Sequence, residues 1–160
     1  MAAIDYERTI RAYFDACTAG DARAIAAFFA PDAVHYFPAG DVYPDGSPQR
    51  AFRGAAAIGH GFGDRFGGEF ATRWTVDHVL VDPERREAVI EWSNFKPSVA
   101  ADARLRGAEF YRFDAEGKIL EIRAYYACPP GAPDGAYELG DFDYAARGYP
   151  LAGSHADGVA

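Results

Sequence analysis

The apolar positions near the start of the chain recur with the period of a helix. Within residues 4–18 the apolar side chains are three or four positions apart, which predicts an amphipathic helix with one buried face. They are Tyr6, Ile10, Tyr13, Phe14 and Cys17. Gly20 is expected to end this helix, and Asp21 to cap a second helix over DARAIAAFFA that Pro31 stops.

A short strand, a long loop and a third helix follow. Residues 33–37, AVHYF, have strand character, and the next segment, PAGDVYPDGSPQRAF, is a loop of about 15 residues that is long enough to be a pocket lid. A helix is predicted from about Gly54 to Phe66. Gly59, Gly61 and Gly63 weaken it, which indicates either close approach of a ligand or strand, or an irregular helix.

The second half of the chain has the pattern of a β-meander. Four runs rich in β-branched and aromatic residues are joined by turn sequences such as DPER and DAEG. The runs are FATRWTVDHVLV, EAVIEWSNFK, ARLRGAEFYRF and KILEIRAYYA. Strands joined in this way predict a curved antiparallel sheet with the helices on one face, which is an α+β fold. An irregular, aromatic-rich tail follows Ala127.

Composition narrows the class of protein. A chain of 160 residues fits one domain, and its net charge of -8 disfavours nucleic acid and anionic membrane surfaces as partners. The N-terminus has no apolar signal core and no run is long enough to span a membrane, so we expect a cytoplasmic protein. Cys17 and Cys128 form neither a disulfide framework nor a zinc cluster, and no metal or nucleotide cofactor is expected.

Two stretches resemble a known superfamily. YFDACTAGDARAIAAFFAPDAVHYFPAG is similar to the opening of the SnoaL-like and ketosteroid isomerase-like families of the nuclear transport factor 2-like superfamily, and RGAEFYRFDAEGKILEIRAYY is similar to their last hairpin. The resemblance covers residues 5–127. It implies a cone-shaped α+β barrel, with three N-terminal helices packed on a curved, mainly antiparallel sheet. Residues 1–130 would form this domain, and residues 131–160 a tail that packs on the body or on a neighbouring subunit.

The resemblance carries over only part of the isomerase machinery. In ketosteroid isomerases a tyrosine and a protonated acid form the oxyanion hole, and the matching positions here are Tyr13 and Glu109. The position of the general base is Phe37, which cannot take a proton. Isomerase chemistry with the usual base is therefore not expected.

The other familiar mechanisms of this fold lose their key residues too. Scytalone dehydratase-like enzymes place an aspartate where this chain has Thr18 and a histidine near Trp74, and the epoxide hydrolases place an aspartate near Ala124. The fold also hosts cyclases and non-catalytic binders, so the reaction has to be argued from the site.

With Glu109 placed inside the cone, as the resemblance implies, strand alternation predicts which side chains share faces with it and with the other site positions. They are Gly107, Tyr111, Phe113, Trp92, Asn94, Lys96, His35, Phe37, Thr72, Trp74, Val76 and His78. We regard three residues as catalytic candidates. His35 could replace the missing base, or be a core histidine bonded to backbone or to a subunit interface. Glu109 could shuttle a proton with a raised pKa, or be paired with an arginine. Tyr13 could stabilise an oxyanion, or be a core tyrosine.

The remaining candidates would bind the substrate. An inward Lys96 could act as a base or reach water at the strand end, and Asp41 in the loop could supply a carboxylate or only form a turn. The full set of substrate-binding candidates is Phe37, Asp41, Phe62, Trp74, Trp92, Asn94, Lys96 and Tyr111.

These residues favour a cofactor-independent lyase or isomerase that acts on a hydrophobic, aromatic or polycyclic small molecule by dehydration or loss of a small fragment. The alternatives are a non-catalytic small-molecule binder of the same fold and a protein-interaction domain. A homodimer or homotrimer is expected through the outer sheet face, where Phe95, Phe110 and Tyr125 would lie.

Overall fold

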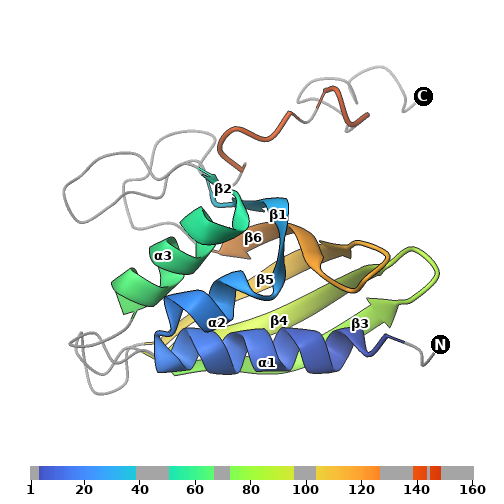
Figure 1. Ribbon diagram of the computed structural model, residues 1–160. Coiled ribbons are helices and arrows are strands. Elements are labelled where there is room, and N and C mark those ends of the chain that lie inside the picture. Colours follow the sequence, from blue (N-terminus) through green and yellow to red (C-terminus); the bar gives the residue numbers. More distant parts are fainter. Residues whose placement is uncertain are drawn as a thin grey trace, which may run out of the picture.

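The structure is a computed structural model that describes residues 4–38, 51–66, 73–95, 104–126, 139–143 and 145–148. Three helices and six strands form the described fold (Figure 1). They are α1 (Tyr6–Ala19), α2 (Ala22–Ala26), β1 (Phe29–Tyr36), β2 (Phe52–Arg53), α3 (Ala55–Phe66), β3 (Arg73–Asp82), β4 (Glu87–Phe95), β5 (Arg104–Phe113) and β6 (Ile119–Tyr126). Among the described helices, none is long and apolar enough to cross a membrane.

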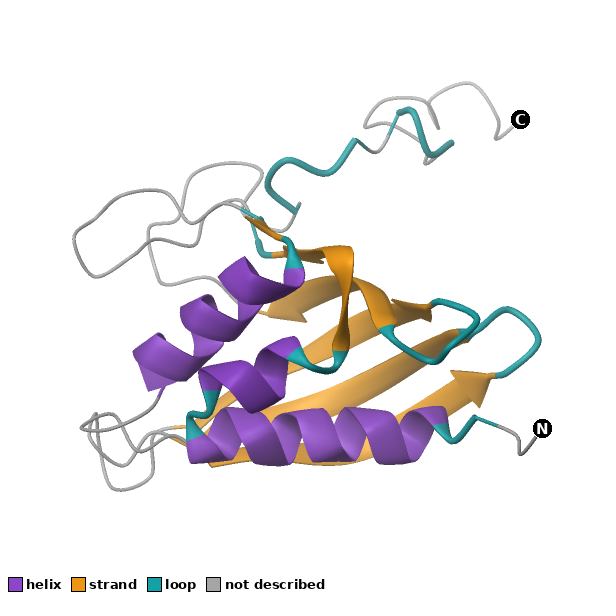
Figure 2. Cartoon of the chain, in the orientation of Figure 1, coloured by secondary structure: helices purple, strands orange, loops and turns teal. Residues whose placement is uncertain are grey.

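The strands make one curved, unclosed sheet in the order β2-β1-β6-β5-β4-β3. β1 pairs with β6 in parallel, and the other neighbours are antiparallel. Figure 2 shows the three helices together on one face of this sheet. The predicted α+β cone with helices on one face of a mainly antiparallel sheet is therefore confirmed.

Helix α1 follows from its sequence. The Asp5 carboxylate accepts a hydrogen bond from the backbone N–H of Arg8 at 2.9 Å, and Gly20 closes the helix in the left-handed conformation with φ of 67°. The predicted apolar face is buried, including Tyr13 and Cys17. The pocket-facing side of α1 is thus fixed by the spacing of its apolar residues.

Helix α2 is shorter than predicted. It ends at Ala26, and Pro31 lies inside β1 instead of stopping the helix. Pairing of β1 with β6 begins at Phe29 and resumes at Val34, with an irregular register between them. Pro31 falls in this irregular part, where a residue without an N–H breaks no regular ladder.

The glycines of α3 allow helix α2 to approach closely. A Cβ atom at Gly59 would lie 2.4 Å from the Ala22 carbonyl oxygen, and one at Gly63 would lie 2.6 Å from the Ala22 Cα. Of the two explanations offered by the sequence, close approach is right: helix α2 approaches Gly59 and Gly63, and the Phe52 ring of strand β2 approaches Gly61. α3 is therefore held tightly over the sheet.

The alternation predicted for β4 and β5 is observed, but β3 contains a bulge. Val76 pairs with Trp92 and His78 pairs with Glu91, so Asp77 is the extra residue. His78 is exposed as a result, and the prediction that it shares a face with Val76 is wrong. Beyond the bulge the alternation is reversed, which turns His78 away from the pocket.

Part of the C-terminal region packs on β1 and β6. Pro38 forms a β-bridge with Leu139, and the Phe142 ring lies 5.2 Å from that of Tyr36. Tyr36 alternates with the inward His35, so this contact is on the outer face of the sheet. Phe110 is 38% exposed on the same face. The homodimer or homotrimer expected through this face stays a prediction.

Candidate active site

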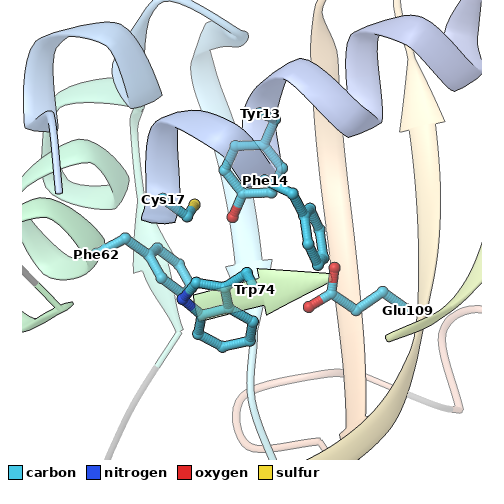
Figure 3. Close-up of a pocket in the computed structure, with 6 residues that line it drawn as sticks. All are labelled: Tyr13, Phe14, Cys17, Phe62, Trp74 and Glu109. Carbon is cyan, nitrogen blue, oxygen red and sulfur yellow. The ribbon is translucent and has the colours of Figure 1, made fainter. Parts of the chain in front are cut away.

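A pocket lies between the helices and the sheet (Figure 3). It is lined by Tyr13, Phe14 and Cys17 from α1, Phe62 from α3, Trp74 from β3 and Glu109 from β5. It contains about 190 Å³ of empty space. That volume includes space open to solvent. The enclosed part measures about 10 Å³, which is room for about one water molecule, so a ring-sized ligand requires the lining side chains to move apart.

Glu109 is the buried acid of this pocket. β5 places it between Ile90 of β4 and Ala124 of β6, and the residue is 5% exposed. Burial raises the pKa of its carboxyl group to about 7, and a hydrogen bond donated by the Tyr111 hydroxyl opposes this rise. Among the described residues no arginine forms an ion pair with Glu109, so the structural alternative of an Arg-paired glutamate finds no support there.

Tyr13 reaches the pocket from the opposite side. Figure 3 shows its hydroxyl and the Glu109 carboxylate pointing into the same space from α1 and β5. Burial raises the pKa of Tyr13 well above its ordinary value, and the charges of Cys17 and Glu109 add to this effect. The phenol therefore stays protonated at neutral pH and can donate a hydrogen bond. A side-chain hydrogen bond joins it to Cys17.

Cys17 and Phe14 line the pocket, although the sequence analysis placed them only on the buried face of the helix. Cys17 is four positions from Tyr13 and three from Phe14 along α1, and these spacings were the signal that could have identified both residues. Burial raises the pKa of the Cys17 thiol, with a smaller contribution from the charge of Glu109. The thiol is thus neutral and not a nucleophile in this state.

His35 is buried next to the pocket but does not line it. Its ring stacks on Phe37 at 4.4 Å and contacts Phe62 at 4.9 Å between centroids. Burial lowers its pKa to about 3, partly opposed by the backbone near the ring, and neither ring nitrogen has a partner at hydrogen-bonding distance among the described residues. His35 is a neutral imidazole behind Phe62, and its role as a base stays a prediction.

The other predicted binding residues occupy different positions. Trp92 packs on Trp74 at 5.1 Å between centroids, and Asn94 is fully buried beside them on β4. Tyr111 acts through its hydrogen bond to Glu109. Asp41 and Lys96 lie outside the described residues. Within the described part of the chain, no three His, Cys, Asp or Glu side chains gather where they could hold a metal ion.

The comparisons with known proteins place the chain in a family. The SnoaL-like domain family matches residues 10–122, and the chain therefore belongs to it. A protein of unknown function with a cystatin-like fold from Methylobium petroleophilum PM1 is 45% identical, with a TM-score of 0.78 and 94% of both chains covered. No curated protein matches the chain in sequence.

More distant structures share the fold alone. SalBIII, an epoxide hydrolase/cyclase-like enzyme of pyran ring formation in the polyether salinomycin, is 17% identical with a TM-score of 0.58, covering 76% of this chain and 90% of its own. A computationally designed 17-OHP binder is 21% identical with a TM-score of 0.58, covering 85% and 96%. The superfamily inferred from the sequence is confirmed, and its fold serves both an enzyme and a binder.

Proposed function

We propose that this protein is a cofactor-independent acid–base enzyme, a lyase or isomerase, that acts on a small hydrophobic aromatic molecule. The observation that carries the proposal is the position of Glu109, a buried carboxyl group on the wall of an aromatic pocket that also contains the Tyr13 phenol. A carboxyl pKa of about 7 suits a group that must both accept and donate a proton near neutral pH.

The chemistry follows from these two groups. The Glu109 carboxylate would take a proton from a carbon next to a carbonyl group, and the C–H electron pair would move into the enolate. The Tyr13 phenol would donate a hydrogen bond to the negative oxygen. Return of the proton from Glu109 to a different carbon completes an isomerisation. Alternatively, its transfer to a departing hydroxyl group completes a loss of water.

The geometry supports Glu109 over His35 as the group that moves the proton. Glu109 lines the pocket, whereas the Phe62 ring, which itself lines the pocket, packs against the His35 ring. A pKa of about 3 also makes the His35 imidazole a weak base at neutral pH. Tyr111 is a positioning residue in this account, because its hydroxyl holds the Glu109 carboxyl group.

The experiment is enolisation of a compact two-ring ketone, 2-tetralone, followed by NMR as exchange of its α-hydrogens in D2O. We expect the wild-type protein to speed up this exchange. Glu109→Gln should lower the catalysed rate by about 100-fold or more, since a positioned acid–base group contributes about 10²–10⁴. The matched control is Glu91→Gln, the same change at an exposed position on β4.

The outcomes separate an enzyme from a binder. Loss of exchange in Glu109→Gln, with 2-tetralone still bound and Glu91→Gln unaffected, supports the proposal. Binding of 2-tetralone without any exchange by the wild-type protein would contradict it, and would favour the alternative of a non-catalytic binder.

A further inference from the structure

Two buried polar groups on β4 have no partner among the described residues. Both the amide nitrogen and the amide oxygen of Asn94 are unpaired, although the residue is 0% exposed. The indole N–H of Trp92, which is 2% exposed, is unpaired as well. Buried polar groups are nearly always hydrogen-bonded because an unmade bond costs free energy, so a pair of such side chains on one strand needs an explanation.

Both side chains are on the sheet face that bears the pocket. Asn94 pairs across the strands with Trp74, which lines the pocket, and the Trp92 ring packs on that same Trp74. The Trp92 ring also lies over Gly107, where a Cβ atom would come within 2.5 Å of it. A larger residue at that position would displace the indole, so the missing side chain lets Trp92 lie flat beside the pocket.

The strand register sets the distance between this pair and the catalytic acid. Ile90 is directly opposite Glu109, and Asn94 is further along β4 on the same face. With a rise of about 3.4 Å per residue, Asn94 lies about 14 Å along the strand from the level of Glu109.

We propose that Asn94 and the indole N–H of Trp92 form a second, polar end of the ligand site, which binds a neutral group carrying both a carbonyl oxygen and a hydrogen-bond donor. This inference rests on the proposed function only in that the same pocket takes the ligand. The ligand is then a flat aromatic molecule with its reacting carbonyl at Glu109 and a carboxamide or a hydroxyl–carbonyl pair at the other end.

The donors and acceptors of the pair determine this chemistry. The Asn94 amide offers N–H donors beside one acceptor, and the Trp92 indole offers one donor, so a carbonyl oxygen next to an N–H or O–H complements them. An anionic group fits poorly. The chain carries a net charge of -8 and the pocket contains Glu109, which would repel an anionic ligand once it is ionised.

The test compares two probes that differ only in the polar group, 2-naphthamide and 2-ethylnaphthalene. Binding is followed by tryptophan fluorescence, because both tryptophans of the chain, Trp74 and Trp92, are at the site. In Asn94→Leu, which keeps the side chain's shape, we expect affinity for 2-naphthamide to fall about tenfold and affinity for 2-ethylnaphthalene to stay within about twofold. Trp92→Phe should likewise lower the affinity for 2-naphthamide but not for 2-ethylnaphthalene. Binding to this variant is followed by the fluorescence of Trp74.

Stability gives an independent readout. A buried side chain that binds the ligand but is unpaired in the free protein lowers the stability of the free protein. Replacing it with an apolar side chain of similar shape should remove this cost, so Asn94→Leu should raise the Tm by a few degrees. The matched control is Ser93→Ala on the outer face of the same strand, where Ser93 donates to the Asp77 carboxylate. It should leave the affinity for both probes unchanged.

Two results would overturn the proposal. One is equal affinity of the wild-type protein for both probes, or no binding of 2-naphthamide. The other is a lower Tm for Asn94→Leu with unchanged affinity, which would assign Asn94 a structural role. The proposed function fails separately, because α-hydrogen exchange by Glu109 is measured on 2-tetralone, which lacks the second polar group.

Discussion

Glu109 couples the chemistry of the pocket to the stability of the protein. Its carboxyl pKa is about 7 in the folded state, against an ordinary value of 4.5, so between these values the folded state binds more protons than the unfolded state. Stability therefore falls as the pH rises from about 4.5 to about 7, by up to about 3 kcal/mol. Glu109→Gln should remove this dependence and be more stable than wild type at pH 8. Urea unfolding of wild type and Glu109→Gln at pH 5 and pH 8 measures this pH dependence. The same dependence in both proteins would contradict the prediction.

Tyr111 provides a second test at the residue scale. Its hydroxyl donates to the Glu109 carboxyl group and so lowers that pKa against the effect of burial. Tyr111→Phe should shift the Glu109 pKa further upward. The pH–rate profile of 2-tetralone exchange should then move to higher pH by about one unit. A profile that stays in place or moves to lower pH would show that the hydrogen bond does not act on the catalytic group.

Individual site residues were predictable to different degrees. The resemblance and strand alternation identified Tyr13, Glu109 and Trp74, all of which line the pocket. Alternation also placed His35 on the inner face, but it could not show that Phe62 would pack against its ring. A period of two along a strand gives the face of a side chain, whereas its depth depends on how the helices pack over the sheet.

At the scale of elements, the contact between α2 and α3 is the clearest target. Gly59→Ala should destabilise the protein by about 1–3 kcal/mol, because the new Cβ atom would lie 2.4 Å from the Ala22 carbonyl oxygen. Helix propensity alone predicts the opposite sign, a gain of up to about 1 kcal/mol. Thermal unfolding of Gly59→Ala shows whether the steric clash or the helix propensity has the larger effect on stability. The control is Ala56→Gly at an exposed position of α3, which should cost only the propensity difference.

The elements themselves followed from hydrophobic periodicity, but one boundary and one bulge did not. Phe28 and Phe29 continue the helical pattern of α2, yet Phe29 pairs with Ile119 in the sheet. Tertiary pairing there outweighs local propensity. The bulge at Asp77 inserts one residue into β3 and leaves no mark in the apolar pattern before it.

At the scale of the whole molecule, the C-terminal segment is attached through a partly buried ion pair. Arg147 donates two hydrogen bonds to the Glu121 carboxylate, at 2.8 and 3.0 Å, and its guanidinium lies 4.2 Å from the centre of the Phe142 ring. Within the described part of the chain, Arg147→Met should leave Glu121 with only the longer contact to Arg123 at 3.8 Å, and it should lower stability by about 1–3 kcal/mol.

The control for this prediction is Arg85→Met. Arg85 pairs with Asp82 at 3.6 Å on an exposed turn, so its loss should change stability by less than about 1 kcal/mol. Equal effects of the two variants in urea unfolding would contradict the role of Arg147. The sequence predicted an aromatic tail that docks, but not this pair, because nothing local indicates that Glu121 is buried or that Arg147 reaches it.

The central claim is that a buried carboxyl group in this pocket is half-protonated near neutral pH. The measurement that tests it most directly is a ¹³C NMR titration of the side-chain carboxyl carbons, with the Glu109 signal assigned by its loss in Glu109→Gln. We expect a Glu109 pKa of about 7. Titration near 4.5, the ordinary value, would show a solvated carboxylate, and the acid–base role proposed for Glu109 would be wrong.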